Sequence, residues 1–385
     1  MSLAATESAV AAPAPSQHAH ADWPFLIASA AATALLVALV LIDGQLAAAA
    51  LVLAGFALGA VFLKAEFSFT ASWRRLIVRG QADGFLGGLL MIAIAAAVIV
   101  PASAFVPGYG GAIAPLGPSL LIGAFVFGAG MQLANACGSG TLYTAGGGSG
   151  RMLVALAFFI AGSVIGSLHL PAVMALGGVD PILASNFLGP WGGLLATWAT
   201  LAVAVFAAVT LARRRGSAYV PSSRIAFGAV AIGLLCIAVF AAGHHPWSVT
   251  FGFTVWGAKI AMLFGADFSH AEFWQWPGPR RALADSILSD TSSLTDLGMI
   301  LGAMAAAALK PFGRAPWPPV GSLVAAALGG LLMGYGARLG FGCNIGAFVG
   351  GVASGSLHGW VWFAAALPGC MLGIKLRPLF GLSRE

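Results

Sequence analysis

Two cysteines stand in matching sequence surroundings 206 residues apart. Cys137 is followed by Gly-Ser-Gly140, and Cys343 is followed by Asn-Ile-Gly346. At the same offset, the glycines and the leucine that precede the two cysteines also coincide: Gly128 with Gly334, Gly130 with Gly336, and Leu133 with Leu339. A thiol offers a weak S–H donor and a soft, polarisable sulfur. A neutral thiol of this kind suits contact with a sulfur-bearing anion better than with a hard oxyanion.

The Gly-rich segments after the two cysteines predict short helices that begin there. The start of a helix has unpaired N–H groups and the positive end of the helix dipole, so two such starts that face each other form an anion site. Glycine allows an anion to approach the backbone closely. The candidate substrate-binding residues of these segments are Cys137, Gly138, Gly140, Cys343, Asn344 and Gly346.

A second, shorter pair of segments repeats at an offset of 184. Phe67-Ser-Phe-Thr70 matches Phe251-Gly-Phe-Thr254, and each copy precedes its cysteine motif in the same order. Ser68, Thr70 and Thr254 therefore join the candidate substrate-binding residues. We expect no catalytic residue, no metal site and no cofactor.

A purely structural explanation exists for some of these features. Regularly spaced small residues such as Gly334 and Gly336 commonly serve helix packing in membranes. Cys236 and Cys370 lie inside apolar stretches without a Gly motif, so we interpret them as packing residues. No pair of the four cysteines has the CxxC spacing of a zinc or redox site, and we expect free thiols.

The composition predicts a membrane protein. Hydrophobic residues make up 59% of the 385 residues and charged residues 8%, about a third of the charge in a soluble domain. Apolar side chains in such excess must face lipid. The 53 glycines and 20 prolines exceed the needs of plain spanning helices, which predicts broken helices. The net charge of +6 lies in short clusters between apolar runs, so no nucleic-acid partner is expected.

Apolar runs long enough to cross a bilayer predict an all-α polytopic membrane protein with about ten transmembrane helices. The expected spans are 24–42, 45–63, 84–104, 118–136, 152–170, 189–212, 225–242, 292–309, 319–337 and 358–376. Four shorter or Gly-rich stretches are expected to be re-entrant half-helices, at 67–80, 138–150, 250–265 and 344–356. Basic clusters after every second span favour N- and C-termini in the cytoplasm.

The repeated segments lie five spans apart, and an odd number reverses their direction across the membrane. We therefore expect an inverted repeat, the usual plan of transporters with broken helices at a central site. The predicted divisions are a disordered tail 1–22, an extra helix 23–44, a first repeat 45–170, a linking helix and basic loop 171–224, a second repeat 225–378 and a tail 379–385.

Three motifs resemble a known family over about residues 50–378. The stretches 334–347 with 354–360, 131–143 and 246–257 are similar to segments of the YeeE/YedE sulphur-transport family. The resemblance implies thiosulfate uptake across a bacterial inner membrane. It also implies that cysteines along a narrow central path pass the ion by S–H···S contacts, at the positions of Cys137 and Cys343. A small cytosolic sulfur carrier of the TusA type often works beside such proteins.

One departure from the family leaves the cargo open. The family often has a third cysteine where this chain has Ser68, a harder hydrogen-bonding group. Another sulfur or selenium anion, such as sulfite, is therefore the alternative cargo. A membrane thiol-redox enzyme is the weaker alternative, because it needs a reactive cysteine pair near one face. Charged residues near the half-helices either guide ions or snorkel to the interface, and we favour snorkelling: Lys64, Glu66, Arg75, Lys259 and Arg338.

Overall fold

The computed structural model describes residues 21–309 and 318–384, and these residues form helices joined by short loops without a β-sheet. Nine helical stretches within them are long and apolar enough to cross a membrane. The fold is therefore that of an all-α polytopic membrane protein, as the composition predicts. Most of the predicted tail 1–22 and the basic residues Lys310 and Arg314 lie outside the described residues.

The helices of the first half follow the predicted order of long and short segments. They are α2 (Leu46–Ala65), α3 (Phe69–Arg79), α4 (Asp83–Phe105), α5 (Pro118–Ala134), α6 (Gly138–Gly146) and α7 (Gly150–Met174). The short helices α3 and α6 coincide with two of the four stretches predicted as half-helices.

The second half has the same order with one insertion. Its helices are α9 (Ser223–Gly243), α10 (Thr250–Leu263), α13 (Thr291–Ala308), α14 (Val320–Leu339), the π-helical turn η2 (Asn344–Val349) continued by α15 (Gly350–Ala353), and α16 (Leu357–Leu376) with its 3-10 extension η3 (Arg377–Phe380). The insertion between α10 and α13 forms α11 (Glu272–Gln275), α12 (Pro277–Ala284) and the 3-10 turn η1 (Ile287–Ser289). The sequence patterns did not predict these three elements.

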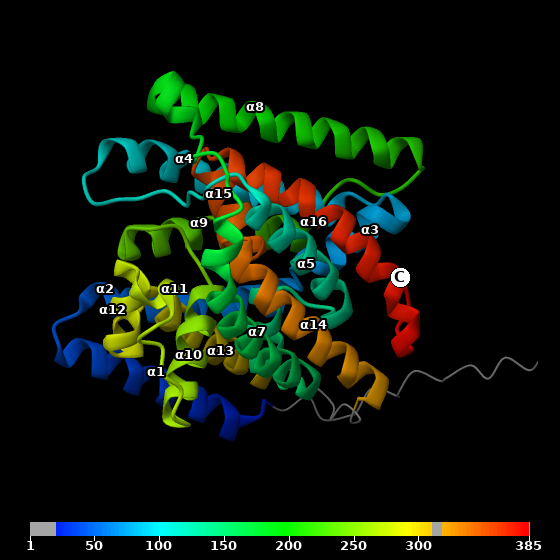
Figure 1. Ribbon diagram of the computed structural model, residues 1–385. Helices are drawn as coiled ribbons and strands as arrows, with labels where there is room; N and C mark the ends of the chain where they lie inside the picture. Colours follow the sequence, from blue (N-terminus) through cyan, green and yellow to red (C-terminus); the bar gives the residue numbers. More distant parts are fainter. Residues whose placement is uncertain (1–20, 310–317, 385) are drawn as a thin grey trace, which may run out of the picture.

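The two halves pack through corresponding neighbours. Helix α2 lies against α13, and its counterpart α9 lies against α4. Helix α7 packs on α14, and its counterpart α16 packs on α5. The short helices α3 and α10 contact α16 and α7, respectively. Helices α5 and α14 meet at the centre (Figure 1). The repeat in sequence is therefore also a repeat of packing.

Glycine permits the close crossings between these long helices. At Gly302 of α13, an added Cβ would collide with the carbonyl oxygen of Phe56 in α2. At Gly369 of α16, it would collide with the carbonyl oxygen of Phe125 in α5. These glycines serve helix packing, the explanation that the sequence left open for small residues.

Two helices stand outside the paired halves, on opposite edges of the bundle (Figure 1). Helix α1 (Trp23–Ile42) packs on α2 and α13, and α8 (Ala184–Arg214) packs on α4. Helix α8 extends beyond the predicted span 189–212 because it continues across a break at Gly189, whose φ is 69°. Both helices present large apolar side chains outward, as lipid-facing helices do.

Candidate substrate-binding site

Cys137 caps the start of α6 after a sharp turn. Asn135 takes the left-handed conformation with φ of 63° and ends α5, and Cys137 then adopts an extended backbone. The N–H of Gly140 donates to Cys137 Sγ at 3.4 Å. The hydroxyl of Ser139 lies 3.4 Å from the same sulfur. The thiol thus sits at the positive end of the helix, where the N–H groups of its first turn are free of helical partners.

Cys343 occupies the same kind of turn at the start of η2. Phe341, two residues earlier, is left-handed with φ of 58°, as Asn135 is before Cys137. The backbone angles of Cys343, φ −104° and ψ −165°, nearly equal those of Cys137, −99° and −169°. The two motifs that match in sequence therefore share a backbone conformation.

The two cysteine turns meet in the interior. A Cβ on Gly138, the residue after Cys137, would lie 3.0 Å from Cys343 Sγ and 3.4 Å from the methyl group of Thr250. The residues Cys137 and Cys343 are 2% and 0% exposed. Glycine at position 138 thus leaves space next to the Cys343 sulfur. Both thiols are closed off from solvent in this structure.

The short helices α3 and α10 approach the same region through corresponding contacts. Gln132 Nε2 donates to the Thr70 carbonyl at 3.3 Å. Arg338 Nη1 donates to Thr254 Oγ1 at 3.5 Å. Gln132 and Arg338 are related by the offset of 206, and Thr70 and Thr254 by the offset of 184. Residues related by the two sequence offsets therefore make corresponding contacts in the two halves.

The remaining candidate residues take distinct places. The hydroxyl of Ser68 caps α3 by accepting the N–H of Ala71 at 3.2 Å. Gly140 packs against Ala136 and Cys137, and Gly346 lies near Ser248 on the loop before α10. Ser68 is half-buried, whereas Cys137 and Cys343 are fully buried. Its hydroxyl therefore serves as a cap on α3 and is not enclosed as the two thiols are.

Several buried polar atoms near these turns have no hydrogen-bond partner in the described part of the chain. They are Thr70 Oγ1, both side-chain polar atoms of Asn344, and Trp247 Nε1. Asn344 directly follows Cys343 and is 0% exposed. Buried polar groups are normally paired, so unpaired ones at such a place indicate groups that can bind a ligand.

Aromatic rings form one wall of this region. The ring centroid of Phe62 lies 5.8 Å from that of Phe67, 5.5 Å from that of Tyr143 and 5.9 Å from that of Trp247. The Tyr143 hydroxyl donates to the Phe67 carbonyl at 3.3 Å. These contacts fix α6 against α2 and against the turn that leads into α3.

An arginine cluster at the end of α5 was not predicted. Arg74 donates to Asn135 Oδ1 at 2.7 Å, Arg151 to the Ala134 carbonyl at 2.7 Å, and Arg377 to the Gln132 carbonyl at 2.6 Å. Cations favour the C-terminus of a helix. The groups that these arginines bind lie two to five residues before Cys137, so the cluster places positive charge beside the Cys137 turn. Its members come from distant segments, so no local pattern could reveal it.

The snorkelling interpretation is wrong for Arg338, and Lys259 binds backbone carbonyls of the inserted segment. The guanidinium of Arg338 lies 5.8 Å from the ring centroid of Phe251 and 5.1 Å from that of Phe273, inside the protein. The ammonium of Lys259 donates to the carbonyls of Leu283 and Asp285 at 2.8 and 2.7 Å. The inserted segment 266–290 covers both side chains, and the sequence did not predict its helices.

Comparison with known proteins identifies the family. The model of the family described as "Sulphur transport" matches residues 64–372. The chain belongs to the sulphur transport family. The match includes both cysteine motifs and the two short helices α3 and α10. The protein is therefore a polytopic membrane protein of this family.

Three relatives extend this comparison. Two proteins called "Probable transporter YedE", from Salmonella typhimurium and Escherichia coli, are 36% identical over 155 residues, 39% of this chain. That match spans only 37% of the length of each YedE protein. A "Thiosulfate transporter TsuA" from Spirochaeta thermophila is 28% identical over 336 residues, 80% of this chain and 92% of that protein.

Proposed function

We propose that this protein imports thiosulfate along a path that runs between Cys137 and Cys343. The observation that carries the proposal is the meeting of the two cysteine turns, where Cys343 Sγ lies 3.0 Å from the Cβ position of Gly138. The similarity to a thiosulfate transporter over most of both chains supports the choice of cargo.

The chemistry of the two turns suits this anion. Thiosulfate has a soft terminal sulfur that matches the polarisable thiols, and its oxygens accept hydrogen bonds from free N–H groups at the starts of α6 and η2. The unpartnered amide of Asn344 supplies a further donor. This binding needs no lysine or arginine side chain between the two cysteine turns, so the affinity stays low enough for the ion to leave. Gly140, Gly346, Thr70 and Thr254 line the approach in this proposal.

The alternative cargo is another sulfur or selenium anion, and Ser68 favours it. The hydroxyl at this position is a harder group than the cysteine common in the family, and it already caps α3. Competition by sulfite or selenite against labelled thiosulfate separates the two cargoes. An inner-membrane location, cytoplasmic termini, the inverted orientation of the two halves and a TusA-type carrier beside the transporter are parts of the same proposal.

Growth on thiosulfate as the only sulfur source tests the proposal in cells that lack their own uptake system. We expect the chain to restore growth and Cys343→Ala to abolish it, while the variant remains in the membrane. Cys370→Ala is the matched control, because Cys370 is equally buried but lies within α16. Undiminished growth with Cys343→Ala would remove the thiol mechanism.

A further inference from the structure

Asp296 is an unpaired carboxyl group in the interior of a membrane protein. It lies on α13, is 0% exposed, and neither side-chain oxygen has a hydrogen-bond partner among the described residues. The adjacent Thr295 packs against Gly55, near the middle of α2, so Asp296 lies near the middle of the bundle. An ionisable residue at such a depth is costly and marks a functional site by default.

The surroundings of Asp296 favour a proton over a metal cation as its partner. An isolated carboxylate in a low-dielectric interior is strongly disfavoured, and protonation removes the charge. A sodium ion would need several oxygen ligands gathered around it, but neither Asp296 oxygen has a polar partner among the described residues, and the hydroxyls of nearby residues point to other groups. Ser293 Oγ donates to Asp290 and accepts from Trp256 Nε1, and Thr295 Oγ1 donates to carbonyls of its own helix.

Asp296 lies within one helical turn of the candidate path. A Cβ on Gly252 would be 2.8 Å from Asp296 Oδ2. Thr250, two residues earlier on α10, faces Gly138 and thereby the turn of Cys137. The first turn of α10 therefore separates the carboxyl group from the thiols. A change in the charge of Asp296 acts directly on the half-helix that lines the path.

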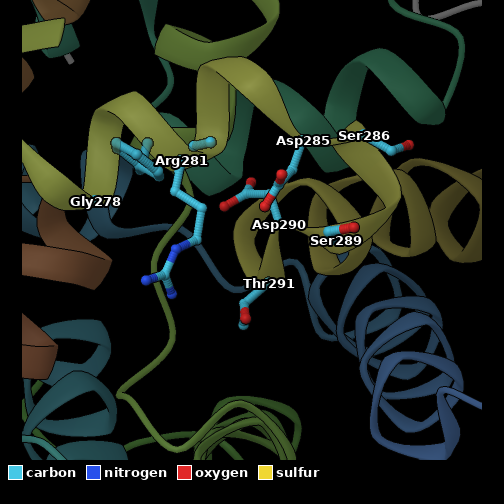
Figure 2. Close-up of a pocket in the computed structure, with 9 residues that line it drawn as sticks. Gly278, Arg281, Asp285, Ser286, Ser289, Asp290 and Thr291 are labelled. Carbon is cyan, nitrogen blue, oxygen red and sulfur yellow. The ribbon is translucent and has the colours of Figure 1, made fainter. Parts of the chain in front are cut away.

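A surface pocket lies at the start of α13, six residues before Asp296. The pocket has a volume of about 180 Å³, and Arg281, Asp285 and Asp290 are among the residues that line it (Figure 2). Asp290 caps α13 by accepting the N–H and the hydroxyl of Ser293, both at 2.7 Å. Ser293 and Asp296 are three residues apart and share a helix face. The side chains of Asp290, Ser293 and Asp296 thus follow one another along α13, from the pocket into the bundle.

Within residues 21–309 and 318–384, no charged group around α13 pairs with the Asp296 carboxyl. α1 and η1 contribute no charged side chain. The titratable groups on the remaining elements around α13, on the neighbouring η2 and α14, and at their caps are Lys64 and Glu66 of α2, Cys137 and Tyr143 of α6, Lys259 of α10, Asp290 at the α13 cap, Cys343 before η2, and Tyr335 and Arg338 of α14. Lys259 lies two helical turns from Gly252 and binds carbonyls of the inserted segment, and Arg338 contacts Thr254 and two phenylalanine rings.

We propose that Asp296 binds the proton that drives anion uptake, which makes the protein a proton–anion symporter. The inference rests on the proposed function and adds its driving force. An anion that enters a cell with a negative interior must move against the membrane potential, at a cost of about 2.3 kcal/mol per charge and 100 mV. Protonation of Asp296 from the outer pocket and release to the inside would couple the proton gradient to that movement.

Accumulation of labelled thiosulfate in proteoliposomes at clamped membrane potential tests the coupling. With one coupled proton, we expect about tenfold higher accumulation for each pH unit of inward proton gradient. Asp296→Asn is expected to lose this dependence, and Asp267→Asn, a change at an exposed loop carboxylate, is expected to keep it. Asp296→Glu is the second variant should the asparagine form fail to fold, and it is expected to keep the dependence. Full dependence in Asp296→Asn, or accumulation driven by a sodium gradient instead, would overturn the inference.

Infrared spectroscopy tests the proton site without any cargo. The wild-type protein is expected to show the carbonyl stretch of a protonated carboxyl group that disappears in Asp296→Asn and persists in Asp267→Asn. The same band in all three proteins would contradict protonation of Asp296. Because this readout does not need thiosulfate, it separates failure of the proton site from failure of the proposed cargo.

Discussion

At the scale of single residues, the two cysteine turns combine soft sulfur with free backbone donors. Phe341 adopts the left-handed conformation at a cost, since bulky side chains rarely do so, whereas asparagine tolerates it at Asn135. The left-handed residue stands two positions before the cysteine in both halves, and each turn places a thiol at the start of a short helix. Strained residues commonly gather at functional sites, which supports a functional purpose for both turns.

Asn344 provides a prediction about affinity. If its unpartnered amide donates to the anion, Asn344→Ala will raise the thiosulfate KM roughly tenfold to hundredfold, since a hydrogen bond to a charged group contributes about 1.5–3 kcal/mol. The melting temperature should change little, because no internal hydrogen bond is lost. Uptake kinetics measured over a range of thiosulfate concentrations give the KM.

Gln132→Ala is the contrasting variant for this test. Gln132 accepts from Arg74 and donates to the Thr70 carbonyl, so its loss should lower stability. A wild-type KM in Asn344→Ala would show that the amide does not contact the cargo.

At the scale of elements, small residues set how closely the helices approach and hence where the half-helices end. The crossing of α2 and α13 holds Asp296 near α10, and the crossing of α5 and α14 holds the ends of both helices near their cysteine turns. Much of the positioning of the site therefore depends on glycines that never contact the cargo.

Gly302→Ala tests this dependence at the crossing of α2 and α13. The added methyl group would collide with the Phe56 carbonyl, and overpacking of this kind costs about 1–3 kcal/mol. We expect a lower melting temperature of the purified protein in detergent. Gly278→Ala on α12 is the control, since its Cβ would meet nothing within 4 Å. Equal melting temperatures for the two variants would refute the role of the crossing.

The sequence predicted most elements because each depends on local composition. Apolar runs gave the spans, and interruptions by glycine and serine gave α3 and α6 within a few residues. Other features depend on contacts between distant segments. The helices α11 and α12 lie in a mixed polar stretch without clear periodicity, and Asp296 is hidden in an apolar run. The cluster of Arg74, Arg151 and Arg377 forms only when α3, α7 and the end of α16 meet at α5.

At the scale of the whole molecule, two halves with corresponding packing enclose the cysteine turns, and α1 and α8 stand at opposite edges (Figure 1). The thiols are closed off from solvent in this arrangement. In the proposed mechanism, an ion passes only when the segments around the two cysteine turns move apart. The proposed proton site at Asp296 lies against the first turn of α10, where a change of charge would act on one of these segments.

Uptake of labelled thiosulfate by proteoliposomes that contain the purified protein tests the central claim most directly. The account predicts uptake by the wild-type protein and by Cys370→Ala, and its loss in both Cys137→Ala and Cys343→Ala with the proteins still folded. Uptake at the wild-type rate by both of these variants would contradict a path between the two thiols.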